Sequence, residues 1–291
     1  MDTALTLRLA CEKNQPVDDK TALQLLETSS LVSKLTEQPT SENNLSNLFN
    51  LVALAEIPFA GHLEHTKELL NKIEQTLATP EGFSYTGAGN DIVPCYNAML
   101  LEAYTRLGLS QSASAQNALN WIKKYQLFER EQQSTWNGTG IFKHGGCLNT
   151  VPCYIGIGKT MRALLTYREY QQEPDLEVAE LIKQGLAYML KHRFFLRLSE
   201  ERPISKHITA SAFPQSYFLS LTDLVYIMGK GSVTNDSHAQ PLLELLQKKQ
   251  IGNNQWKLEY IYSYKGYVSF ESRRKPSEWL SQLYPLWLLN G

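Results

Sequence analysis

Apolar residues recur along this chain in five segments, each of which a proline precedes. The segments are 45–57, 97–107, 155–167, 217–228 and 279–289, and the prolines are Pro39, Pro94, Pro152, Pro214 and Pro276. Successive prolines are 55, 58, 62 and 62 residues apart, and the tripeptide Pro-Cys-Tyr stands at both the second and the third. A repeat of about 60 residues is typical of stacked supersecondary units.

Each repeat predicts two helices of different character. In the first repeat, Ser41 and Asn43 can cap a helix that begins at Leu45, and a second helix is expected over 63–77. The first helices of later repeats (96–107, 155–165 and 217–228) are apolar on several faces. The second helices (115–125, 176–190 and 242–246) carry an apolar stripe on one side only. Residues 1–38 add two helical patterns before the repeats.

This alternation predicts an all-α protein of one domain, residues 1–291. A ring of helical hairpins buries one set of helices inside and leaves the other set half exposed, whereas an open solenoid exposes both sets. We therefore expect an α/α toroid of about five to six helix pairs, with repeats that start near residues 39, 94, 152, 214 and 276.

Long linkers precede the first-type helices, over 79–93, 127–151, 194–213 and 251–275. Loops of this length are often functional. In a toroid they lie together on one face, beside the N-termini of the inner helices, and there we expect a site. In the last linker the pattern of Tyr260, Tyr262, Tyr264 and Tyr267 predicts a strand or hairpin over the mouth of the ring.

Composition narrows the class of protein. The net charge of −1 provides no field that attracts nucleic acid or an anionic membrane surface. No apolar run approaches the ~20 residues that a membrane span needs, and Met1-Asp2-Thr3 lacks the layout of a secretory signal. Four cysteines do not form a disulfide framework, so a cytoplasmic location is expected.

The chain resembles the prenyltransferase and squalene–hopene cyclase superfamily over roughly residues 40–291. Degenerate glutamine–tryptophan motifs carry the resemblance: Ala118-Leu119-Asn120-Trp121-Ile122 with Gln126 and Trp136, and 245–250 with Gly252 and Trp256. Further segments resemble the uncharacterised bacterial and archaeal branch of that superfamily: 185–190 with His192, Phe213-Pro214 with Tyr217 and Asp223, 256–259, and Ser277-Glu278-Trp279. The resemblance implies a toroid and a terpenoid cyclase-like or prenyltransferase-like activity.

The sequence departs from the motifs that carry chemistry in this superfamily. It contains neither the Asp-x-Asp-Asp motif of the cyclases nor Asp-Asp-x-x-Asp, and its one pair of adjacent aspartates, Asp18 and Asp19, lies outside the repeats. The zinc ligands of the protein prenyltransferases have no residue-by-residue match either. Prenyl chemistry is thus implied by the resemblance alone.

Cysteine and histidine near two inner helices suggest a metal site. Cys95 and Cys153 stand at equivalent positions, and His144 and Cys147 lie in the linker before the second of them. Three thiolates and an imidazole suit a tetrahedral zinc ion. The alternative is that the cysteines are small buried apolar residues, which is their commoner role.

Basic residues also recur at equivalent positions, in the linkers before the inner helices. His207, Arg273 and Arg274 are expected to bind an anionic head group near helix N-termini, while solvated surface charge is the alternative. Tyr154, Tyr217 and Trp279 can line a cavity for the apolar part of the ligand, or pack in the core.

Asp223 is the candidate catalytic residue, because an acid within an apolar helical segment is unusual. A structural salt bridge is the alternative. The sequence therefore leaves two functions open. One is a toroid that binds an apolar ligand, such as an isoprenoid, with an anionic head in its central cavity; the other is a non-catalytic scaffold for a peptide or protein.

Overall fold

The computed structural model describes residues 1–289 except 133, 137 and 139–151, and this part of the chain is mainly helical. The α-helices are α1 (Thr3–Glu12), α2 (Asp19–Glu27), α3 (Ser30–Thr36), α4 (Asn44–Ala55), α5 (Glu64–Thr76), α6 (Pro94–Arg106), α7 (Ala113–Tyr125), α8 (Tyr154–Tyr170), α9 (Leu176–Lys191), α10 (Leu221–Lys230), α11 (Gln240–Lys248) and α12 (Glu278–Leu289). A short 3-10 helix, η1 (Ala60–His62), and an antiparallel pair of two-residue strands, β1 (Ala78–Thr79) and β2 (Gly82–Phe83), complete the regular structure of these residues. The all-α fold class is confirmed.

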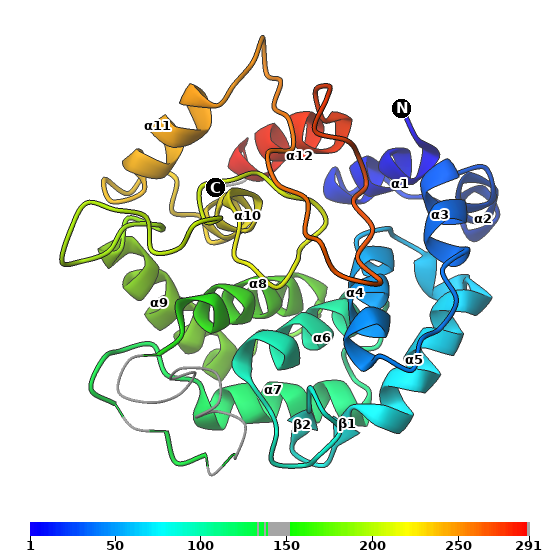
Figure 1. The fold of residues 1–291 in the computed structure, drawn as a ribbon, viewed down its shortest axis with the longest axis horizontal. Coiled ribbons are helices and arrows are strands. Elements are labelled where there is room, and N and C mark those ends of the chain that lie inside the picture. Colours follow the sequence, from blue (N-terminus) through cyan, green and yellow to red (C-terminus); the bar gives the residue numbers. More distant parts are fainter. Residues whose placement is uncertain (133, 137, 139–151, 290–291) are drawn as a thin grey trace.

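Two sets of helices follow one another around the molecule in Figure 1. We call α1, α4, α6, α8, α10 and α12 the inner helices. Each of α4, α6, α8 and α10 packs against the next member of this set, and α1 contacts α12. The helices α2, α5, α7 and α9 pack on the outside of α1, α4, α6 and α8 respectively.

Burial separates the two sets as the sequence predicts. Every residue of α8 from Gly156 to Tyr167 is buried, and so is every residue of α10 from Leu221 to Gly229. The outer helix α5 instead buries one stripe, formed by Thr66, Leu69 and Ile73. This contrast is confirmed, and it follows from the period of the apolar residues in each helix.

Side-chain caps decide where several helices begin. The Asn43 side chain accepts hydrogen bonds from the backbone of Leu45 and Ser46, which starts α4 where the sequence predicts. Ser29 caps α3, so the second of the two helical patterns expected in residues 1–38, which the sequence opens at Asp18 and Asp19, is divided into α2 and α3. The prediction of a helix start at Tyr217 is wrong as well, because Ser220 and Asp223 form a capping box and α10 begins only at Leu221.

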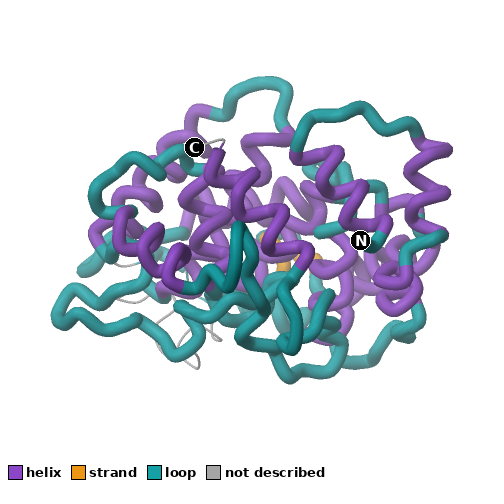
Figure 2. The backbone as a smooth tube through the Cα atoms, turned by 90° about the horizontal axis from the view of Figure 1, so that it is seen from above, coloured by secondary structure: helices purple, strands orange, loops and turns teal. Residues whose placement is uncertain are grey.

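The longest loops gather on one side of the helices, below them in Figure 2. One of them, residues 256–275, is called the strap here. The expected strand or hairpin in the strap is wrong: its tyrosines lie in irregular backbone that pairs with no strand. Tyr262 and Tyr264 pack their rings on Phe49 of α4, at centroid distances of 5.2 and 5.4 Å. The strap therefore stays in place through aromatic packing rather than through a ladder of backbone hydrogen bonds.

None of the helices described is long and apolar enough to cross a membrane.

Candidate functional site

Charged side chains fill the space between the inner helices. Arg162 of α8 donates to both oxygens of Glu102 on α6, with Nη2–Oε1 and Nε–Oε2 distances of 2.7 and 3.1 Å. Its Nη2 also donates to Glu56 at the end of α4 (2.9 Å), and its Nη1 lies 3.2 Å from Asp223 of α10. All four side chains are about 1% exposed. One guanidinium thus joins the carboxylates of three other elements.

The ion pairs extend outwards from Arg162 on both sides. Arg8 of α1 donates to Glu56 Oε2 at 2.7 Å, and Lys159 Nζ lies 3.3 Å from Asp223. Lys230 of α10 contacts Glu12 of α1 at 3.0 Å, which links helices far apart in the sequence. We call this set the central ion network; its cations are Arg8, Arg106, Lys159, Arg162 and Lys230, and its carboxylates are Glu12, Glu56, Glu102, Glu169 and Asp223.

Burial and the neighbouring charges in the central ion network shift the pKa values of Glu12 and Lys159. Burial alone raises the pKa of Glu12, but the nearby charges of Arg8 and Lys230 outweigh it and lower this pKa to about 2. Burial is also the largest influence on Lys159, and together with the charge of Arg162 it lowers the pKa of that amine against the attraction of Asp223. The carboxylate of Glu12 is therefore held ionised by its two cations, which favours a structural role for it.

A cavity of about 780 Å³ opens above the network at the C-terminal ends of the inner helices. Arg8, Glu12, Arg106, Glu169 and Lys230 line it. Each of these charges already has a partner of opposite sign within the protein. A ligand that bound these five side chains would have to displace one of these internal partners. Lys13, which also lines the cavity, is exposed and lies in no ion pair among the described residues.

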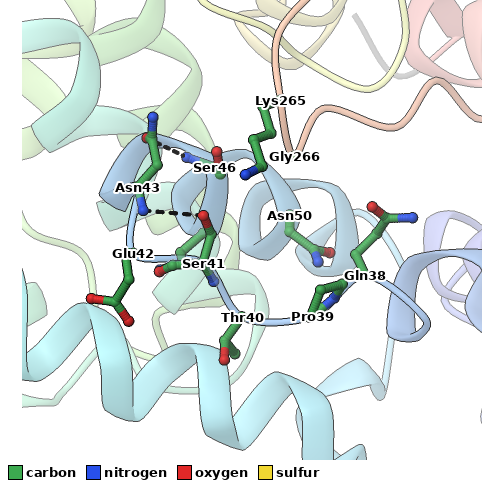
Figure 3. A pocket seen from close by; sticks show the side chains of 11 residues that line it. Gln38, Pro39, Thr40, Ser41, Glu42, Asn43, Ser46, Asn50, Lys265 and Gly266 are labelled. Carbon is green, nitrogen blue, oxygen red and sulfur yellow. Dashed lines mark hydrogen bonds between the residues drawn. The ribbon is translucent and has the colours of Figure 1, made fainter.

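A second cavity, of about 470 Å³, lies at the other end of α4, on the side of the linkers; we call it the polar pocket (Figure 3). Residues 38–43 and the first two turns of α4 form one wall, and Lys265 and Gly266 of the strap form the other. Most of its side chains are amides or hydroxyls, which both donate and accept hydrogen bonds. The pocket is therefore polar without a dense cluster of charge.

Two buried polar atoms in the wall of the polar pocket lack partners among the described residues. They are Ser46 Oγ and Asn50 Oδ1, on side chains of residues that are each 3% exposed. The Asn50 amide nitrogen, by contrast, donates to Leu35 O at 3.3 Å and lies 3.2 Å from His65 Nε2, which fixes the orientation of that side chain. Buried polar groups are rarely left unpaired in folded proteins. Eleven such side-chain atoms occur among the described residues, and Ser46 Oγ and Asn50 Oδ1 belong to residues that line this pocket, which makes the pocket a candidate site.

The strap approaches α4 closely where it forms the pocket. Gly266 has a φ of +84°, and a Cβ at this position would lie 2.4 Å from the backbone oxygen of Ser46. Only glycine fits both the left-handed conformation and this contact. The Tyr267 hydroxyl donates to Pro214 O at 2.8 Å and so fixes the next residue of the strap. Lys265 is consequently held beside Ser46 (Figure 3).

The two unpaired atoms lead to a prediction about stability. Replacing Ser46 with alanine is expected to leave the free energy of unfolding within about 0.5 kcal/mol of the wild type, because no protein partner of the hydroxyl is lost. Ser29→Ala is the matched control, since Ser29 is also buried but its hydroxyl caps α3 and donates to Asp2. The control should lose about 1 kcal/mol in urea unfolding. Equal losses in both variants would show that the Ser46 hydroxyl is structurally engaged and would remove this argument for a ligand.

Asp223, the predicted catalytic residue, lies in the central ion network. Its carboxylate accepts from the backbone and hydroxyl of Ser220 and contacts Lys159 and Arg162. The structure thus gives it both a capping role and ion pairs, the alternative that the sequence left open. With 1% of its surface exposed, it reaches neither of the two cavities described above.

Of the four predicted zinc ligands, His144 and Cys147 lie outside the described residues. Cys95 is buried at the start of α6, and burial together with the nearby Cys153 raises the pKa of its thiol to about 12. Among the residues that the structure describes, no group of three or more histidine, cysteine, aspartate or glutamate side chains is arranged to hold a metal ion. The zinc site stays a prediction.

The predicted anion-binding residues lie on the linker side. His207 stacks on Tyr260 of the strap at a centroid distance of 3.9 Å, and burial lowers the pKa of its imidazole. Arg273 and Arg274 are exposed and line a shallow groove together with Lys257. None of the three lines the polar pocket.

The predicted aromatic residues are engaged with other parts of the protein. The Tyr154 hydroxyl donates to Phe194 O at 2.8 Å, and Trp279 is buried against Phe213 and Phe270. The ring of Tyr217 packs near that of Tyr96, at 5.8 Å. These contacts correspond to core packing.

The sequence pattern did not indicate most of the central ion network or the two unpaired atoms of the polar pocket. A signal for the network was present: Glu56, Glu102, Lys159 and Arg162 all interrupt apolar segments, as Asp223 does. For the pocket, Ser41 and Asn43 were identified as caps only. Nothing in the sequence connects them to Lys265, more than 200 residues away.

Comparisons of the sequence with family models and with curated proteins gave no match.

Proposed function

We propose that this protein is an α/α toroid that binds a small polar ligand in the polar pocket. The contact between α1 and α12 supports closure of the ring, and so does the hydrogen bond from Arg8 of α1 to Glu56 after α4. The ligand proposal depends on one observation above all: two buried, unpaired polar atoms, Ser46 Oγ and Asn50 Oδ1, line a cavity of about 470 Å³. Small-molecule sites commonly have volumes of about 300–1,000 Å³.

An apolar or isoprenoid ligand inside the ring stays a prediction with less support. The space between the inner helices holds the central ion network, and Arg162, Glu102 and Lys159 there are at most about 1% exposed. An apolar tail among these groups would separate charges from their partners, which is strongly unfavourable in a buried site. A polar ligand at the linker side requires no such displacement.

A thermal-shift panel tests the proposal. The panel contains glucose, glucuronate, a hexose monophosphate, glycine and farnesyl diphosphate, measured with the wild type and with Thr40→Trp. Thr40 is exposed at the polar pocket, so tryptophan there fills the opening without entering the core. We expect a polar compound to raise the melting temperature of the wild type, because a ligand at 100 times its Kd stabilises by about 2.7 kcal/mol. Thr40→Trp should abolish that shift.

Thr28→Trp, on an exposed residue at the end of α2, is the control and should keep the shift. The proposal fails if no compound stabilises the wild type or if the shift survives Thr40→Trp. A shift with farnesyl diphosphate alone would instead favour the apolar ligand.

A scaffold that binds a peptide or protein is the second candidate. The buried ion pairs between the inner helices favour it, because an enzyme of this architecture would be expected to have a cavity there rather than paired charges. Under this candidate none of the small molecules changes the melting temperature.

A further inference from the structure

The hydrogen-bonding groups in the polar pocket fall into two classes. Asn47 and Asn43 are occupied by the protein: the Asn47 amide pairs with the backbone of Ser41 at 2.7 Å in both directions, and Asn43 caps α4. Ser46 Oγ and Asn50 Oδ1 are free, and no described residue hydrogen-bonds to the side chain of Thr40. The free groups are therefore the hydroxyls of Ser46 and Thr40, which donate and accept, the amide oxygen of Asn50, which accepts, and the side-chain amide of Gln38, which also has no hydrogen-bond partner among the described residues.

These groups complement the hydroxyls of a ligand. A hydroxyl donates one hydrogen bond and accepts others, so it can satisfy the Asn50 oxygen and the Ser46 hydroxyl at once. Ionised groups lack this dual capacity, since a carboxylate only accepts and an ammonium only donates. Of the residues that line the pocket, only Pro39 has a predominantly apolar side chain, so an apolar tail finds little to pack against.

Two charged residues line the polar pocket: Lys265, and Glu42, whose carboxylate points away from the pocket. Glu42 points toward α5 (Figure 3), where it pairs with Lys72 at 3.2 Å. Lys265 reaches beside Ser46 from the strap, and among the described residues no carboxylate lies within ion-pair distance of it. The ammonium group is thus available to a ligand. The N-terminus of α4 adds a weak positive field, although Asn43 already occupies its first amides.

We propose that the ligand is a small polyhydroxylated molecule with one anionic group, such as a sugar acid or a sugar phosphate. Its hydroxyls bind Ser46 and Asn50 at the base of the pocket, and its anionic group binds Lys265 at the rim. This assignment rests on the proposed function, because it specifies the ligand of the same pocket.

Isothermal titration calorimetry on the full chain tests the ligand class with five probes: glucuronate, a hexose monophosphate, glucose, inorganic phosphate and farnesyl diphosphate. We expect at least one of the two hydroxylated anions to bind up to about fivefold more tightly than glucose, because only an anion gains the ion pair with the exposed Lys265. The preference between glucuronate and the hexose monophosphate identifies carboxylate or phosphate as the anion. Inorganic phosphate should bind more weakly than both, since it brings no sugar hydroxyls.

Two variants separate the contributions of charge and hydroxyl. Lys265→Gln, on an exposed residue, should bring the hydroxylated anion to within about twofold of glucose and leave glucose unchanged. Ser46→Ala should weaken glucose and the anion by a similar factor. Lys20→Gln, at an exposed lysine of α2, is the matched control and should change nothing.

The outcomes distinguish this inference from the proposed function. If glucose binds as tightly as both anions, or if Lys265→Gln changes the affinity for neither anion, the anionic assignment is overturned. The proposal of a polar ligand whose binding Thr40→Trp blocks still stands in that case. If glycine raises the melting temperature in the thermal-shift panel, Thr40→Trp abolishes that shift and no hydroxylated probe binds, the ligand class is wrong and the pocket is right. If the hydroxylated anion binds Thr40→Trp as tightly as the wild type, it does not bind in the polar pocket. That result would overturn both the proposed function and the ligand class.

Discussion

Arg162→Met is expected to lower the free energy of unfolding by about 3–5 kcal/mol, because removing one partner of a buried ion pair leaves its counter-charges uncompensated. The guanidinium contacts Glu56, Glu102 and Asp223, and all three carboxylates are about 1% exposed. Methionine is unbranched and apolar and fills part of the space that the arginine side chain leaves, so the loss reports chiefly the missing charge. Urea unfolding at neutral pH measures it.

Two further variants show whether burial is the cause. Arg197→Met removes an arginine that pairs with Glu200 at the surface, where it is 53% exposed, and should cost no more than about 1 kcal/mol. Arg162→Lys keeps the charge but lacks the planar fork that reaches several carboxylates, and it should fall between the two. A loss for Arg162→Met no larger than that for Arg197→Met would contradict a central role of the ion network in stability.

Acid is expected to unfold the protein over the range in which Glu12 becomes protonated. The folded-state pKa of Glu12 is about 2, against an ordinary value of 4.5. A depressed carboxyl pKa stabilises the folded state above the ordinary value, and this contribution disappears as the pH falls through the folded value. Glu12 alone should therefore contribute about 3 kcal/mol at pH 7 that is lost between about pH 5 and pH 2.

Glu102 adds to the same trend. Burial raises its pKa, but the charges of Arg162 and Arg106 outweigh burial and lower this pKa well below its usual range.

Melting temperatures measured from pH 7 to pH 2.5 in the wild type and in Glu12→Gln test the prediction. The variant is less stable at pH 7 but should lose less stability on acidification. Parallel curves below about pH 5 would show that Glu12 does not drive the acid transition.

The local rules of helix formation predicted much of the secondary structure. The stripe over 63–77 corresponds to α5 (Glu64–Thr76), and the segments at 115–125 and 176–190 correspond to α7 and α9. The errors arose where a cap overrode the apolar pattern: Ser29 divides the segment before residue 36, and Ser220 delays the start of α10. The tyrosines of the strap alternate like a strand, yet their rings pack on Phe49 without any strand partner.

The candidate site was much less predictable. An acid in an apolar segment identified Asp223 as unusual. Glu102 and Arg162 also interrupt apolar segments, but no pattern in the sequence shows that these charges pair with one another. The polar pocket joins residues 38–50 to Lys265 and Gly266, and its decisive feature is the absence of partners for two atoms. Whether a serine or asparagine is paired depends on every neighbour in space, which a sequence pattern does not contain.

The sequence by itself determined that this protein is helical, that its helices form a buried and a half-buried set, and that long linkers precede the buried set. These properties follow from the spacing of apolar residues, from proline and from capping side chains, which act within a few residues of one another. The tertiary structure alone decided that Arg8, Glu56 and Arg162 meet between the inner helices and that the strap closes the polar pocket against α4. The physical reason is that ion pairs and cavities are set by the packing of whole helices, so residues 48 and 106 positions apart in the chain become neighbours.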